Sequence, residues 1–311
     1  MVLARIKQQR GVTLIIVVGV VAIVILTMLA KWAMSDLERK LLVQTNMQNK
    51  LAKIDKALLD FVVQRRRLPC PADGTIPSGA INAGLESPFP ATGTCNPVNQ
   101  IHGVIPWVTL GLLEGDAIDS WNGRFTYRVD PALAGIAPLL MDMSNCDNSG
   151  TGSVAASGAC KSPVSNCAAS PSTCTAPSNF LTGKGIDVWD GIGGAAGWAA
   201  RQNNRATGTG AAYVIISHGA TGAGAYNSNG IYQPGTIGLI AKIPPPGTQL
   251  AGDDEIPNLN NQALALPSLM ANTYRDAPFD KSRSTTNFDD YLSHPTISSV
   301  LKQANLGARI H

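Results

Sequence analysis

The chain has 311 residues, 14% of them charged, and a formal net charge of +3. Without a basic stripe or an acidic tract, this composition argues against a nucleic-acid binder and against a binder of basic partners. The 31 glycines and 20 prolines favour a loop-rich β domain after the N-terminal segment.

A long uncharged segment follows a short basic head. Arg5, Lys7 and Arg10 precede the nineteen uncharged residues Val12–Ala30. A secretory signal peptide has a shorter apolar core and a small-x-small cleavage site, which is missing here. About twenty apolar residues cross a bilayer, so the segment predicts a single-pass membrane helix with a cytoplasmic N-terminus.

The helical pattern continues beyond this segment. No proline or glycine occurs from Val20 to Leu68, and Pro69 predicts a helix end near Arg66. We therefore expect one helix over 12–66, roughly 80 Å long, whose second half is amphipathic. A coiled-coil stalk would have the same periodic face. Its members are Leu37, Leu41, Gln44, Gln48, Leu51, Ile54, Leu58 and Phe61.

The leader ending in Gly11, the sequence Val-Thr-Leu-Ile and the apolar helix resemble type IV prepilins and type II secretion pseudopilins. The resemblance implies that a prepilin peptidase cuts between Gly11 and Val12 and methylates Val12. Major pilins carry glutamate where this chain has Ile16, and the mature chain here begins with valine instead of phenylalanine. The resemblance therefore implies a minor subunit, located at the tip or priming assembly, with other pilins as partners through the N-terminal helix.

The residues after the helix predict a β-rich head over 67–311. Asn122-Gly123 is a turn dipeptide, and the alternation in Arg124–Val129 is typical of a strand. The stretch around it resembles the start of the pilin sheet and a subgroup of large prepilin-type proteins. We expect Trp107, Trp121 and Tyr127 to be core aromatics rather than ligand-stacking residues.

The six cysteines all follow the apolar segment, which favours disulfides in an oxidising compartment. A structural zinc site is the weaker alternative, because there is no C-x-x-C pair and the four histidines are scattered. Short loops favour the pairs Cys70–Cys95, Cys146–Cys160 and Cys167–Cys174. A Ser-, Ala- and Gly-rich insertion at about 145–178 contains four of the cysteines and is predicted to be a surface loop.

The segment 211–226 predicts a buried strand followed by a glycine-rich turn. Ser217 and His218 are not expected to form a catalytic pair, because neighbouring residues in a strand point to opposite faces. Acidic residues gather near the C-terminus and are candidate calcium ligands, since this ion prefers clustered oxygens. Solvated acids in loops are the alternative. The candidates are Asp253, Asp254, Glu255, Asp289 and Asp290.

These features predict an α+β chain of three parts: a leader over 1–11, a membrane-spanning then amphipathic helix over 12–66, and a disulfide-stapled β-rich head packed on it. The expected role is a minor pilin or pseudopilin of a type IV pilus or type II secretion system, first in the inner membrane with the head in the periplasm of a Gram-negative bacterium. A tip adhesin that recognises a surface or DNA is the first alternative. A membrane-anchored enzyme is the second, and we expect neither an enzyme nor a cofactor other than calcium.

Overall fold

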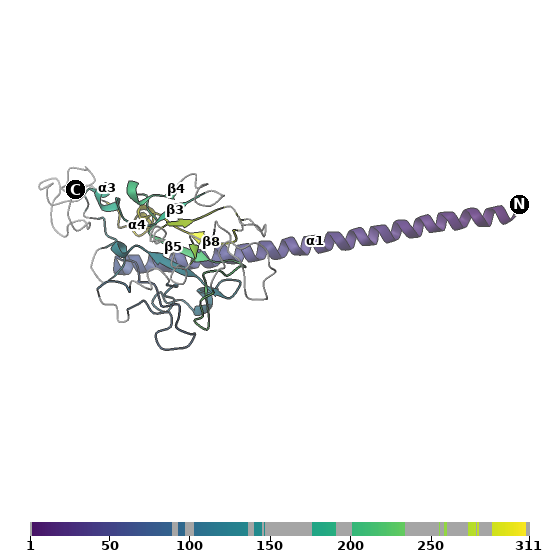
Figure 1. Cartoon of the computed structure of the whole chain (residues 1–311). Coiled ribbons are helices and arrows are strands. Elements are labelled where there is room, and N and C mark those ends of the chain that lie inside the picture. Colours follow the sequence, from purple (N-terminus) through teal and green to yellow (C-terminus); the bar gives the residue numbers. More distant parts are fainter. Residues whose placement is uncertain are drawn as a thin grey trace. The chain divides into compact units, whose positions relative to one another are not determined.

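A computed structural model describes the fold of the chain (Figure 1). The described residues are 2–88, 93–96, 103–135, 140–144, 146, 176–190, 201–233, 255, 258–259, 273–277, 279 and 288–308. In the first helix, the side chains of 2–17, 30, 32–33, 35–37 and 39–40 are outside this description. Two compact units divide the chain, Met1–Gln48 and Asn49–His311, and each is treated by itself below.

Helix α1 extends over Val2–Arg65. It continues through the predicted leader, although we expected a helix to start only after Gly11. A single glycine inside a helix costs about 1 kcal/mol, which the neighbouring helix-forming residues tolerate. The helix ends where Arg66 adopts a left-handed conformation with a φ of 53° and its N–H bonds to the carbonyl of Val62.

The membrane-spanning part of the predicted fold class is wrong, and so is the predicted single-pass location in the inner membrane. Among the described residues, no helix is long and apolar enough to cross a membrane. Before residue 41, the side chains of α1 that the structure describes are those of Val18–Leu29, Lys31, Met34 and Glu38.

The last turns of α1 belong to the second unit and bury one face. Leu51, Ile54, Leu58 and Val62 are at most 8% exposed. Their spacing of three and four residues places them on the same side of the helix. Three of these positions belong to the predicted face, whereas Phe61 is half-buried and Val62 takes the fully buried place.

Among the described residues of the second unit, the strands form three small sheets. The central sheet has the order β2-β5-β8, a second has the order β4-β3-β7, and a third pairs β1 with β6. All pairs are antiparallel except β3 with β7. The strands are β1 (Gly123–Arg124), β2 (Thr126–Val129), β3 (Asp187–Trp189), β4 (Arg201–Asn203), β5 (Tyr213–Ser217), β6 (Tyr226–Asn227), β7 (Thr273–Arg275) and β8 (Tyr291–Ser293).

Short helices connect the strands. In the part of the head that the structure describes, the α-helices are α3 (Pro177–Leu181) and α4 (Ile297–Gln303), and the 3-10 turns are η1 (Glu114–Asp116), η2 (Pro131–Leu133) and η5 (Arg205–Thr207). The Oγ1 of Thr296 caps α4 by accepting from the backbone N–H of Ser299. Strand β8 precedes α4 directly in the chain.

The core of the head forms around β5, in which all five residues are buried. Val214 and Ile216 pack with Val188 of β3 and Tyr274 of β7 in one apolar cluster. Val214 and Ile216 are two residues apart and therefore point to the same face of β5, where they pack the central sheet against the second sheet. The predicted buried strand in 211–226 is confirmed.

One predicted disulfide is confirmed, since Cys70 and Cys95 are bonded with their Cα atoms 5.3 Å apart. Cys146 is also disulfide-bonded. The residues Cys160, Cys167 and Cys174, and most of the insertion at 145–178, lie outside the described residues. The other two predicted pairings therefore stay predictions.

Candidate functional site

The first candidate feature is the stretch Val18–Leu29 of α1, called the apolar segment below. Nine large apolar side chains in it are 44% to 66% exposed. Isolated exposed apolar residues are normal, but a contiguous set of this kind marks a surface that binds a partner. The set consists of Val18, Val20, Val21, Ile23, Val24, Ile25, Leu26, Met28 and Leu29.

The predicted processing site precedes this segment in the same helix. Gly11, Val12 and Ile16 all lie in α1, and their side chains are outside the description. Cleavage after Gly11, methylation of Val12 and the role of Ile16 therefore stay predictions.

The second candidate feature is a group of three buried acids, Glu255, Asp289 and Asp290, called the carboxylate cluster below. One carboxylate oxygen from each lies within 4.8 Å of the others. Their exposed fractions are between 1% and 7%. All three were candidate calcium ligands, whereas the other two candidates, Asp253 and Asp254, lie outside the described residues.

Strand pairing explains how residues so far apart in the sequence meet. In the antiparallel pair of β5 and β8, Ser217 is opposite Tyr291. The next residues of β5 therefore approach the residues just before β8. Gly219 makes this approach close, because a Cβ at this position would lie 2.2 Å from the carbonyl oxygen of Asp289. Its φ of 55° also favours glycine.

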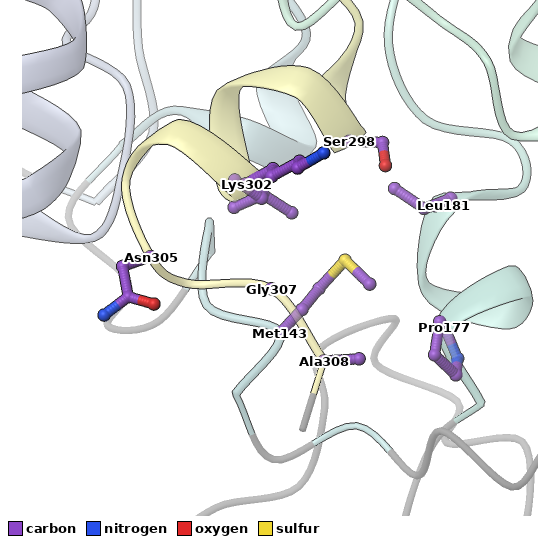
Figure 2. A pocket seen from close by; sticks show the side chains of 9 residues that line it. Met143, Pro177, Leu181, Ser298, Lys302, Asn305, Gly307 and Ala308 are labelled. Atoms are coloured by element: carbon purple, nitrogen blue, oxygen red, sulfur yellow. The ribbon is translucent and has the colours of Figure 1, made fainter. Parts of the chain in front are cut away.

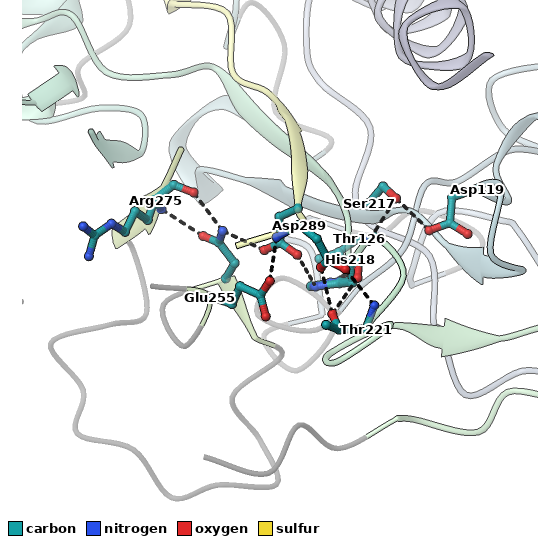
Figure 3. Close-up of polar contacts among 11 residues, drawn as sticks. Asp119, Thr126, Ser217, His218, Thr221, Glu255, Arg275 and Asp289 are labelled. Carbon is teal, nitrogen blue, oxygen red and sulfur yellow. Dashed lines mark hydrogen bonds and ion pairs between the residues drawn. The ribbon is translucent and has the colours of Figure 1, made fainter. Parts of the chain in front are cut away.

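Hydrogen bonds fix the carboxylates in place (Figure 3). The carboxylate of Asp289 accepts from the backbone N–H and the hydroxyl of Thr221, each at 2.9 Å. Glu255 Oε1 accepts from the backbone N–H of Asp289 at 2.7 Å. The side-chain amide of Asn258 donates to Asp290 Oδ2 at 2.9 Å. Each acid therefore has an oriented carboxylate in a buried position.

Asn258 also connects the cluster to β7. Its side-chain amide donates to the carbonyl oxygen of Arg275 and accepts from the N–H of the same residue, each at 2.8 Å. The Asn258 side chain thus makes the same two backbone hydrogen bonds with Arg275 that a neighbouring β-strand would make. In Figure 3 the guanidinium of Arg275 points away from the carboxylates.

His218, the residue directly after β5, lies beside the carboxylate cluster. Its side chain is 1% exposed, and its Nε2 lies 2.9 Å from the hydroxyl of Thr126. Its Nδ1 has no hydrogen-bond partner among the described residues and lies 3.9 Å from Asp290 Oδ1. The sequence alone did not place His218 next to these acids. The antiparallel pairing of β5 with β8 is what brings His218 close to Asp290.

Burial sets the protonation of these groups. Desolvation, together with the charges of Asp290 and Asp289, raises the pKa of Glu255 to about 10. Desolvation and the charge of Asp289 also raise the pKa of Asp290 well above its ordinary value. Desolvation, with a smaller contribution from Arg128, lowers the pKa of His218 to about 3, so the imidazole is neutral at pH 7.

Ser217 and His218 do not form a catalytic pair. The hydroxyl of Ser217 donates to Asp119 Oδ2 at 2.7 Å, whereas the His218 ring contacts Thr126. Trp107 and Tyr127 are buried as expected. The expectation for Trp121 is wrong, because it is half-buried and stacks on Tyr291 with ring centroids 5.9 Å apart.

A cavity of about 380 Å³ lies beside α4 (Figure 2). Met143, Leu181 and Leu301 give it an apolar wall, and Lys302 is the charged residue in its lining. Ser298 and Asn305 add further polar groups, so the lining of this cavity is partly apolar and partly polar.

No family model matches the chain, and neither a curated protein nor a solved structure matches it.

Proposed function

We propose that this chain is a pilin-like or pseudopilin-like filament subunit that assembles through the apolar segment of α1. In this role the helix packs against the helices of copies or related subunits, and the head lies outside the helical core. A minor position, at the tip or in priming assembly, follows from Ile16, since the pairing carboxylate of major pilins is missing. The resemblance of the leader to prepilins supports the same role.

The observation that carries this proposal is the exposure of nine large apolar side chains in Val18–Leu29. Removing apolar surface from water contributes roughly 25 cal/mol per Å², so several aliphatic side chains together provide several kcal/mol of association energy. Helices that pack side by side bury such surface without needing directional bonds. Copies of this helix are suitable partners for one another.

Processing is tested by producing the chain with a prepilin peptidase and measuring the mass of its N-terminal peptide. We expect a chain that begins with methylated Val12. Gly11→Leu should block the cut, whereas Gly19→Leu, at a helix position where a Cβ meets open space, should leave it intact. An uncut wild-type N-terminus, or equal cutting of both variants, contradicts the proposal.

Assembly is tested with Ile23→Lys and Leu26→Lys. These charges would have to be buried between helices, so the variants should disappear from the sheared filament fraction of producing cells. Leu113→Lys is the control, because this side chain of the head is 76% exposed and should tolerate a charge. Filament fractions that contain all three variants equally contradict assembly through the apolar segment.

A further inference from the structure

Beside the carboxylate cluster lies a histidine, His218, one of whose ring nitrogens makes no hydrogen bond among the described residues. The Nδ1 of His218 is buried, has no hydrogen-bond partner among the described residues, and faces Asp290 Oδ1 across 3.9 Å. This distance is too long for a hydrogen bond. Leaving a buried ring nitrogen without a partner is costly, so the arrangement calls for a ligand between the two groups.

The same separation is suitable for two ligands of one metal ion. Zinc binds imidazole nitrogen and carboxylate oxygen at about 2.0 to 2.2 Å, so two such ligands lie about 3.4 Å apart in a tetrahedron and about 4.2 Å apart on opposite sides. The gap of 3.9 Å between His218 Nδ1 and Asp290 Oδ1 falls between these limits. One carboxylate oxygen each from Glu255 and Asp289 lies within 4.8 Å of one from Asp290, so these two acids can supply further ligands on the Asp290 side.

The donor set distinguishes between metals. Calcium takes oxygen ligands, whereas neutral imidazole suits zinc and other first-row transition metals. The contact of Nε2 with Thr126 Oγ1 holds the ring with Nδ1 toward the cluster. A hydrogen bond at the second ring nitrogen is the usual way in which a metal-binding histidine is oriented.

We propose that His218, together with Asp290, Asp289 and Glu255, binds a divalent transition metal such as zinc. The ion would join three separate segments of the head: the end of β5, the loop that contains Glu255, and the residues before β8. Bringing distant segments together in this way stabilises the folded state, because the unfolded chain has no such site. This site is independent of assembly through α1.

The test is zinc binding to the metal-free full chain, measured by titration calorimetry and by thermal unfolding. We expect zinc to raise the melting temperature and to bind more tightly than calcium. Asp290→Asn and His218→Gln should each weaken zinc binding at least about tenfold. The matched control is His294→Gln, because His294 contacts Asn203 and Asp276 outside the cluster; Asp60→Asn, in α1, is the second control.

Equal zinc affinity in the His218→Gln and His294→Gln chains overturns the proposal. So does a wild-type chain that binds calcium more tightly than zinc, or that binds no zinc. If the buried variants fail to fold, nitrogen-15 NMR of histidines in the wild-type chain decides. A zinc-induced shift of a ring nitrogen that persists when His102, His294 and His311 are all replaced by Gln comes from His218 and supports the site, and unshifted ring nitrogens overturn it.

Discussion

Arg124 shows how a single buried charge organises several loops. Its side chain is fully buried, and its Nη1 donates to the carbonyl oxygens of Gly74 at 3.1 Å and Ile76 at 2.7 Å. Its Nη2 donates to Glu114 Oε1 at 2.9 Å and to the hydroxyl of Ser78 at 3.1 Å. The guanidinium reaches these four acceptors because its five N–H donors are spread over three nitrogens in a fixed plane, whereas an ammonium group has three donors on a single nitrogen.

We therefore expect Arg124→Lys to lower the free energy of unfolding by about 2 to 4 kcal/mol, since buried carbonyl oxygens lose their donors. Arg201→Lys is the matched control. Arg201 is 35% exposed, its ion pair with Asp187 is 3.6 Å long, and its replacement should cost less than about 1 kcal/mol. Urea denaturation followed by circular dichroism measures both values, and comparable losses would refute the argument.

Lys184 is a residue whose charge should change with pH just above neutrality. Its Nζ lies 3.6 Å from the centroid of the Phe180 ring, and burial lowers its pKa from 10.5 to about 8. The charged form is therefore less favourable in the folded chain than in the unfolded chain. The contribution of this group to stability is unfavourable below pH 8 and improves as the pH rises from 8 to 10.5.

The neutral amine reacts with acylating reagents, so labelling of Lys184 should reach half of its maximum near pH 8. Ordinary lysines reach this point about two pH units higher. Peptide mass spectrometry of briefly acylated protein between pH 6 and 10 measures the profile, and the exposed Lys56 provides the comparison. Parallel profiles for the two lysines would show that burial does not shift the pKa of Lys184.

Among the elements, α1 is joined to the central sheet by one carboxylate. Asp55 Oδ1 accepts from the hydroxyl of Tyr213 in β5 at 2.9 Å, and its Oδ2 accepts from the hydroxyl of Ser293 in β8 at 2.7 Å. Burial raises the pKa of Asp55, and these two hydrogen bonds partly offset the effect. A helix, a central strand and an edge strand thus share one polar contact at the side of an apolar interface.

Asp55→Ala should lower the free energy of unfolding by about 2 kcal/mol, because two hydroxyl groups lose their acceptor. Asp60→Ala is the control in the same helix. Asp60 pairs with the exposed Lys56, and such pairs contribute about 0.3 to 0.5 kcal/mol. Chemical denaturation of both variants gives the comparison, and an Asp55 effect no larger than the Asp60 effect would disprove the linking role.

Local patterns predicted several elements of the head correctly. The apolar run in Tyr213–Ser217 predicted a buried strand, and the glycines after it predicted the turn at Gly219. The division into three sheets could not be predicted, because pairing depends on contacts between distant segments. The parallel pair of β3 with β7, which joins Val188 to Tyr274, has no local signal in either strand.

The candidate metal site was predictable in part. The acidic pairs near the C-terminus pointed to Asp289 and Asp290, since hard cations need clustered oxygens. His218 was judged by its sequence neighbours alone, where it has no ligand-like spacing. Its place beside Asp290 follows from the antiparallel pairing of β5 with β8, which becomes visible only when Ser217 is matched with Tyr291.

At the scale of the whole molecule, the two compact units differ in whether their apolar side chains are buried. The unit Asn49–His311 contains Leu51, Ile54 and Leu58 and the strands that surround β5. The unit Met1–Gln48 instead contains the apolar segment with its exposed side chains. A unit with its own core can fold alone, whereas a helix with exposed aliphatic residues is stabilised by partners.

A chain that starts at Asn49 should therefore fold and stay monomeric, whereas the full chain associates. The truncation removes the fully buried Met47 but retains Leu51, Ile54, Leu58 and Val62 of α1, so its near-ultraviolet circular dichroism should closely resemble that of the full chain. Sedimentation equilibrium measures the oligomeric state, and Ile23→Lys in the full chain should shift it toward monomer because a buried charge opposes helix packing.

A truncated chain that associates as strongly as the full chain would place the association surface on the head. A truncated chain without a cooperative transition would show that the head needs residues before Asn49 to fold.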